Sequence, residues 1–155
     1  MHTHRRWARR PPLRSRAATL AVGALACLAL ITAAQAPETF TARLSVMPID
    51  RVLQTHVAGS GSGAAVLDGG RLRISGSFSG LRGPATAAWL HEGPAMGVRG
   101  TALFELAVAG GAQGTFSGEV ELSGEQLAGL RQGRLYIQIH SEAAPEGNLW
   151  GWLLR

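Results

Sequence analysis

Two of the chain's five histidines end strand-like runs and are the residues best suited to chemistry. His91 closes the stretch "TAAWLH" and His140 closes "RLYIQIH". Neutral imidazoles are ligands for copper and zinc, so one hypothesis is a metal site built on this pair. A closed zinc site takes four ligands, and Glu92, Glu142 or Met96 would have to complete it. A set of histidine and methionine would instead suit cuprous copper.

The alternative hypothesis, which we prefer, is that both imidazoles are structural. His91 and His140 would share one polar pocket close to Trp89, with each ring nitrogen hydrogen-bonded to chain groups and no tightly held metal. His56 lies in a loop-like stretch, "LQTHVAG", where we expect it to be exposed.

Nothing in the residue pattern indicates catalysis. The sequence contains no nucleophile elbow, phosphate loop or zinc-protease helix motif. Ser141 follows His140 directly, but adjacent residues of a strand point to opposite faces. Glu119 and Glu121 share a face with Ser and Thr, which is typical of a solvated sheet. We therefore expect a protein that is not an enzyme.

Three tryptophans predict a binding surface. Trp89, Trp150 and Trp152 lie opposite the aliphatic faces of their runs, and the last two share a face because they are two residues apart. Exposed aromatic rings favour contact with a protein or a carbohydrate, so we expect an unidentified partner of one of these kinds. In the alternative, a loop covers this face and makes it a second small core.

The elements that must position these residues are strands. Alternation of period two recurs along the chain and predicts an inward-facing core: Leu44, Ile74, Phe78, Leu90, Phe116, Val120, Ile137 and Ile139. The run 101–108 is apolar on nearly both sides and is expected to be a central strand. One short helix is expected near 124–131, because Ser123 and Gln126 form a capping-box pattern.

The strand pattern predicts an all-β fold. About seven short strands separated by Gly-rich turns are typical of an antiparallel sandwich, although the spacing also suits a closed barrel. We expect the sandwich, occupying residues 35–155 as one domain.

The first 34 residues have the composition of a secretory signal. Residues 1–16 carry six arginines and no acid, and residues 17–34 are uncharged and apolar. Cleavage after Ala34 would release the domain into the periplasm or the extracellular space. In the alternative, the segment stays as an anchor and is the sole membrane contact. The one cysteine, Cys27, falls in this segment, so no disulfide is expected in the domain.

The charge balance argues against nucleic-acid binding. The whole chain has a net charge of +5, but from Gln35 onward nine arginines stand against ten acids. The excess positive charge therefore belongs to the signal segment, and a nucleic-acid partner loses its main support.

The order of these pieces resembles the chordin-type (CHRD) domain family. The matching motifs include "LHEGP", "LSGEQLAGLRQGRLYIQIHSE" and the P-x-G-x-x-x-G of Pro145, Gly147 and Gly151. The resemblance implies a Greek-key sandwich of immunoglobulin-like or superoxide-dismutase-like type, and the family occurs in many exported bacterial proteins, usually without an assigned activity.

The chain departs from the family pattern at several positions. Family members often read His-x-His before Gly-Pro, and here Trp89 stands at the first histidine position. Members often end with an acid, an arginine and a glutamine, where this chain has Asn148, Trp150 and Trp152. We therefore expect an exported, non-catalytic CHRD-like binding or structural module. The alternative function is a periplasmic copper- or zinc-binding protein that uses His91 and His140.

Overall fold

The computed structural model describes residues 36–47 and 55–155. In chain order the elements are β1 (Glu38–Val46), β2 (Ser60–Asp68), β3 (Arg71–Ser79), β4 (Ala85–Glu92), β5 (Thr101–Gly110), β6 (Gly114–Glu121), α1 (Gly124–Arg131), β7 (Leu135–Ser141) and β8 (Ala144–Trp152). The signal segment predicted for residues 1–34 lies outside the described residues. Within the described ranges no helix has the length and apolarity needed to cross a membrane.

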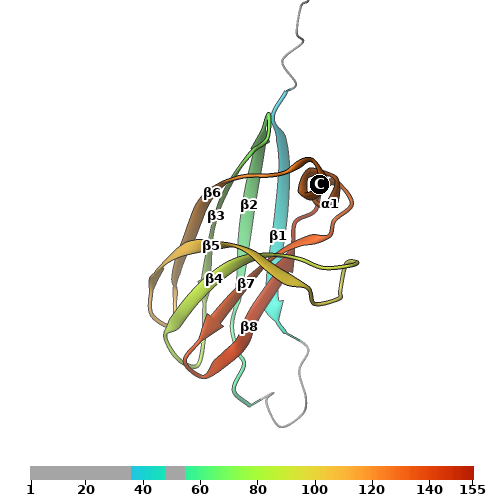
Figure 1. Cartoon of the computed structure of the whole chain (residues 1–155). Coiled ribbons are helices and arrows are strands. Elements are labelled where there is room, and N and C mark those ends of the chain that lie inside the picture. Colours follow the sequence, from blue (N-terminus) through green and yellow to red (C-terminus); the bar gives the residue numbers. More distant parts are fainter. Residues whose placement is uncertain (1–35, 48–54) are drawn as a thin grey trace, which may run out of the picture. The chain divides into compact units, whose positions relative to one another are not determined.

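The strands form one closed antiparallel barrel, in the order β1-β2-β3-β6-β5-β4-β7-β8 (Figure 1). The predicted sandwich is therefore wrong, while the all-β composition is confirmed. A sandwich keeps unpaired edge strands, whereas a barrel has none. Strands β1 and β5 leave no free edge here, because each is hydrogen-bonded to a neighbour on both of its sides. Strand β5 pairs with β4 through its first half and with β6 through residues 107–110.

Strand β1 closes the barrel on the other side. Most of its length pairs with β2, and its last two residues, Ser45 and Val46, pair with Trp150 and Leu149 of β8. Farther along, Thr41 and Leu154 exchange two backbone hydrogen bonds of 2.7 and 2.9 Å as an isolated bridge. We call these contacts the β1–β8 seam.

The barrel interior holds the hydrophobic core, and the predicted inward positions are confirmed. All eight are buried: Leu44, Ile74, Phe78, Leu90, Phe116, Val120, Ile137 and Ile139. Gly76 of β3 also faces inward, where a Cβ would lie 2.2 Å from the Phe116 ring, so the ring occupies space that a side chain would need. The strand expected at 101–108 is flanked on both sides, by β4 and β6, but it is not buried on both faces, because β5 fully buries one side chain, Leu106, and leaves several others exposed.

The predicted helix is confirmed as α1, together with its capping box. Ser123 Oγ accepts a hydrogen bond from the backbone N–H of Gln126 at 3.2 Å, and Gln126 Oε1 accepts from the backbone N–H of Ser123 at 2.9 Å. The helix adds Leu130 to the core cluster.

Candidate functional site

The outer face of three neighbouring strands carries five side-chain rings. Strands β4, β7 and β8 lie side by side (Figure 1). Because alternate residues of a strand share a face, the residues opposite the core gather on the outside of the barrel. We call the resulting group the ring cluster: His91 of β4, Tyr136 and His140 of β7, and Trp150 and Trp152 of β8.

The rings of the cluster are in mutual contact. His91 stacks on Tyr136 with ring centroids 4.9 Å apart, and Tyr136 meets Trp152 at 4.5 Å and Trp150 at 5.8 Å. The two tryptophans meet edge to face at 5.7 Å. Such aromatic pairs stabilise a fold beyond the area that they bury. The cluster is therefore a second packed layer outside the barrel.

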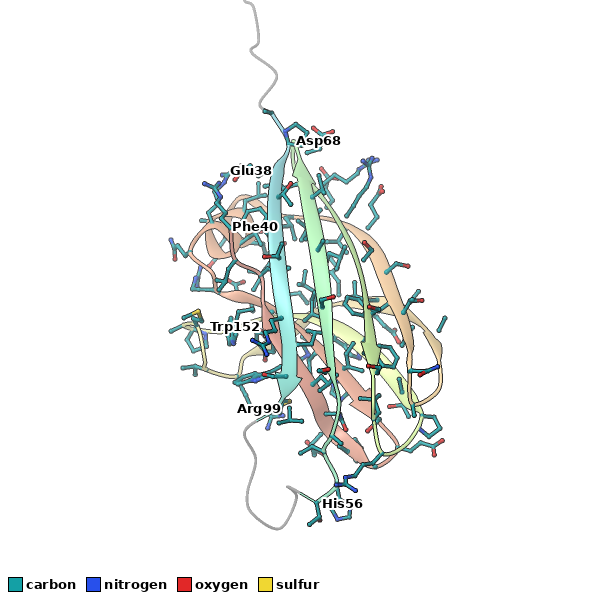
Figure 2. The ribbon with its side chains drawn as sticks, turned by 180° about the vertical axis from the view of Figure 1, so that it is seen from behind. Glu38, Phe40, His56, Asp68, Arg99 and Trp152 are labelled. Carbon is teal, nitrogen blue, oxygen red and sulfur yellow. The ribbon has the colours of Figure 1, made fainter. Side chains whose placement is uncertain are left out.

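The loop 93–100, between β4 and β5, covers this layer. A Cβ on Gly93 would lie 2.9 Å from the Trp152 ring, so the loop passes directly over that tryptophan. The N–H of Gly100 donates to the Tyr136 hydroxyl at 3.1 Å, and Arg99 Nη2 donates to the carbonyl of Glu146 at 2.9 Å. Trp152 and Arg99 lie on the same side of the barrel (Figure 2). As a result Tyr136 is fully buried, while Trp150 and Trp152 are half-buried.

His140 is held in one tautomer by its surroundings. Its Nδ1 lies 2.7 Å from the carbonyl of Pro145, and its Nε2 lies 3.2 Å from Gln138 Nε2. A carbonyl can only accept, so Nδ1 carries the proton and Nε2 accepts from the Gln138 amide. The same amide also donates to the carbonyl of Glu146 at 3.1 Å.

His91 differs from His140, because neither of its ring nitrogens has a hydrogen-bond partner among the described residues. The side chain is 9% exposed. Burial is the main cause that lowers the pKa of His91 below its usual 6.5. The nearby backbone of Gly100 opposes this pKa shift without reaching hydrogen-bonding geometry, while His140 and Arg99 lower the pKa further. His91 is therefore a neutral imidazole at pH 7, which is the form that binds a metal.

The structure brings the two predicted histidines together. Their ring centroids are 6.5 Å apart, so the two rings lie close together as predicted. The expectation that every ring nitrogen bonds to a chain group holds for His140 and is wrong for His91. Trp89 pairs with Gln138 in the β4–β7 register, and the ring that stacks on His91 is that of Tyr136. His56 is exposed as predicted and lies at the end of the barrel opposite Asp68 (Figure 2).

The additional ligands suggested for a zinc site lie elsewhere. Glu92 forms an ion pair with Arg134 at 3.0 Å, Glu142 is exposed, and Met96 is 60% exposed in the loop 93–100. In residues 36–47 and 55–155 no three His, Cys, Asp or Glu side chains converge on one point. A closed zinc site at His91 and His140 is therefore not supported.

Two residues of the site were missed from the sequence. Tyr136 and Gln138 precede His140 by four and two residues, so the same alternation places them on its face. Gln138 Oε1 is buried without a partner in the described part of the chain. The period-two pattern predicts that both share the outer face with His140, but nothing in the sequence marks a tyrosine or a glutamine as part of a site.

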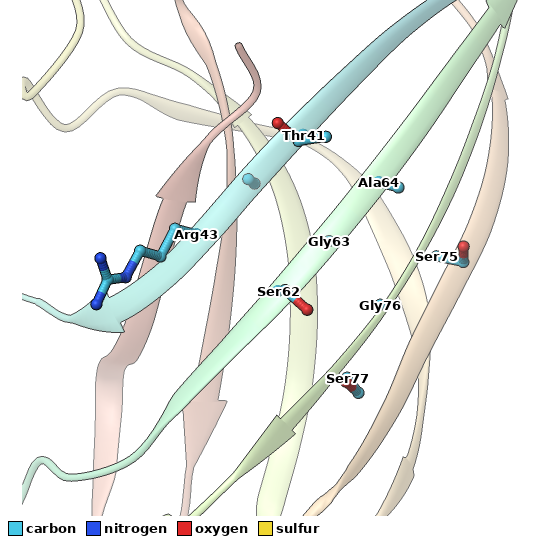
Figure 3. Close-up of a pocket in the computed structure, with 9 residues that line it drawn as sticks. Thr41, Arg43, Ser62, Gly63, Ala64, Ser75, Gly76 and Ser77 are labelled. Carbon is cyan, nitrogen blue, oxygen red and sulfur yellow. The ribbon is translucent and has the colours of Figure 1, made fainter. Parts of the chain in front are cut away.

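A shallow depression of about 470 Å³ lies on another part of the outer surface, over β1, β2 and β3 (Figure 3). Its walls are mostly Ser, Gly, Ala and Thr, with Arg43 as the one charged lining residue. The low relief follows from the small side chains on these strands, and none of the lining side chains is a buried polar group without a partner.

Comparison with known proteins gives one match. The family model of the CHRD domain matches residues 40–153, which include every strand from β2 to β8 and the whole ring cluster. No curated protein and no solved structure matches the chain. The motifs around His91 and His140 thus belong to one continuous match, and the chain is a member of the CHRD domain family.

Proposed function

We propose that the protein is an exported, non-catalytic CHRD domain that binds a protein partner through the loop 93–100 and the adjoining tryptophans. The observation that carries the proposal is exposed apolar surface on this loop. Met96 is 60% exposed and Val98 is 48% exposed, although the loop is tied to the ring cluster at Gly100 and Arg99. An apolar segment held rigidly in solvent is suited to docking, because little conformational entropy is lost on binding.

The side chains favour a protein over a carbohydrate. Trp150 and Trp152 pack against each other and against Tyr136, so their rings are already engaged in the second layer. The exposed large apolar side chains of the loop are Met96 and Val98, which offer apolar contact and no polar group for sugar hydroxyls. Methionine and aromatic residues are enriched in protein interfaces.

A role without catalysis is supported by the partners of the histidines. The two nitrogens of His140 contact a carbonyl and an amide, and those of His91 have no partner among the described residues. General-base activation of a nucleophile requires a ring nitrogen within hydrogen-bond reach of it. Among the described residues neither imidazole has a hydroxyl or thiol as a hydrogen-bond partner.

Export is supported by the composition of residues 1–34. Intact-mass measurement on protein recovered from its own cells tests this part. A mass that begins at Gln35 agrees with export and cleavage, and a mass that still includes residues 17–34 contradicts cleavage.

Site-specific photocrosslinking tests the interface. A photoreactive residue at Met96 is expected to give a discrete adduct in cells, whereas one at Ser75, exposed on the outer face of β3, should give none. Equal labelling from both positions, or no adduct from Met96, would refute the loop as a docking site.

A further inference from the structure

We propose that His91 and His140 bind a single cuprous ion, with the thioether of Met47 as the third ligand. The site is separate from the exposed surface of the loop 93–100, and its presence or absence does not bear on protein binding there. The starting point is the buried imidazole of His91, whose two nitrogens have no partner among the described residues. A buried polar group without a partner in a native protein calls for an explanation, such as an ion or a water.

His140 is oriented as a metal ligand. Metal-binding histidines almost always donate their other ring N–H to a carbonyl or a carboxylate, which fixes the tautomer and the ring direction. Here Nδ1–H donates to the carbonyl of Pro145 at 2.7 Å, so the lone pair that a metal would use is on Nε2. Without a metal, the amide of Gln138 takes up that lone pair at 3.2 Å. The amide can turn away and still keep its second acceptor, the carbonyl of Glu146.

The spacing of the two rings suits one shared ion. A metal bound to a ring nitrogen lies about 3 Å from the ring centroid, because the bond itself is about 2.0–2.1 Å. Two imidazoles on one ion in a nearly linear arrangement are therefore about 6 Å apart. The His91 and His140 centroids are 6.5 Å apart and the rings are stacked with 28° between their planes, so the His91 ring must also rotate about its side-chain bonds to point a lone pair at the shared ion.

Met47 provides a soft donor next to the Gln138 amide that contacts His140. Its side chain is buried, with 2% of its surface exposed. The flexible, polarizable thioether of a methionine can adjust its position to a neighbouring group. A Cβ on Gly147 would lie 2.3 Å from Met47 Sδ and 2.4 Å from Gln138 Nε2, so thioether and amide flank the same point. When the Gln138 amide turns away from His140, the Nε2 side of the His140 ring becomes accessible to the thioether of Met47. Met96, the other methionine near the cluster, is 60% exposed and serves as the natural control.

The ligand set selects the ion. Imidazole and thioether ligands favour copper in its cuprous state, whereas carboxylates and carbonyls favour hard cations. No third His, Cys, Asp or Glu converges on the pair within the described ranges, so a four-ligand zinc site has too few donors. Arg99 lies close enough to lower the pKa of His91, and its charge opposes a divalent ion more strongly than a monovalent one.

The affinity test uses the untagged protein and a chromogenic cuprous chelator as competitor, under ascorbate. We expect one cuprous ion per chain in the wild type. The variants His91→Phe, His140→Gln and Met47→Leu should each weaken binding at least tenfold, and the matched controls His56→Gln and Met96→Leu should not. Binding that all five variants retain, or that Met96→Leu abolishes in place of Met47→Leu, would overturn the assignment.

X-ray absorption at the copper edge gives a readout that a folding defect alone does not produce. The wild type should show nitrogen ligands and one sulfur, and Met47→Leu should lose the sulfur while circular dichroism shows an intact fold. A wild-type spectrum without sulfur would overturn Met47 as the third ligand, and no copper retained in the presence of the competitor would overturn the site as a whole.

Discussion

Replacing His91 by phenylalanine should make the fold less sensitive to acid. Phenylalanine keeps a ring against Tyr136, where the wild-type centroids are 4.9 Å apart, and removes both unpartnered nitrogens. In wild type the pKa of His91 is lowered below 6.5 by burial. Above pH 6.5 the ring is neutral in both the folded and the unfolded state, so its contribution to stability is constant.

Below pH 6.5 the unfolded chain takes up a proton that the folded chain resists, so the free energy of unfolding falls. The slope is at most about 1.4 kcal/mol per pH unit, which gives a loss of up to about 2 kcal/mol by about pH 5. The loss ends once the pH falls below the lowered folded pKa. Urea unfolding of metal-free protein, followed by tryptophan fluorescence between about pH 7.5 and 5, measures this loss.

The control is His56→Gln, which removes an exposed histidine and should keep the wild-type loss. The range stops near pH 5 because a second group titrates below it. The hydrogen bond from Arg73 lowers the pKa of the Glu119 carboxyl below its usual 4.5. If His91→Phe loses as much stability between pH 6.5 and 5 as the wild type does, burial of a neutral imidazole is not the cause.

Three further substitutions test the packing, the loop and the helix. Ile137→Ala should lower the free energy of unfolding by about 2–5 kcal/mol, because the side chain is fully buried in the barrel; a loss under about 0.5 kcal/mol in urea unfolding would mean that it is not a core residue. Tyr136→Phe should cost about 0.5–1.5 kcal/mol, because it removes the acceptor for the Gly100 N–H, and hydrogen exchange of that amide should rise; an unchanged exchange rate would contradict the tether. Ser123→Ala should cost about 1 kcal/mol by loss of the cap to Gln126, measured as a lower melting temperature that Ser123→Asp does not show.

The strand phases and the helix were predictable because they depend on local pattern. Alternation predicts that Leu44, Ile74 and Ile137 face inward, and the pair Ser123 and Gln126 predicts a helix start. Neither prediction requires knowing which strands lie next to each other. Closure of the barrel was not predictable in this way. It depends on whether Ser45 and Val46 meet the backbone of β8, and backbone pairing across a gap leaves no mark on the side-chain pattern.

The candidate site was predictable in part for the same reason. Alternation placed His91 and His140 on the outer face of their strands, and the pairing of β4 with β7 brought them together. The burial of His91 depends on the loop 93–100, whose path is set by Gly100, Arg99 and the close approach of Gly93 to Trp152. The glycine-rich sequence of a loop predicts a turn but not the surface that it covers.

The β1–β8 seam gives the barrel a preferred place to open. Seven residue pairs join β1 to β2, whereas two pairs join it to β8 and one isolated bridge joins it to Leu154, just after β8. Native proteins open in cooperative parts, and the least-paired boundary needs the least free energy. Separation at the seam would expose Leu149 and Leu44 while leaving the other strand pairs intact, so we predict an open, sheet-like excited state of the kind through which barrels exchange strands between copies.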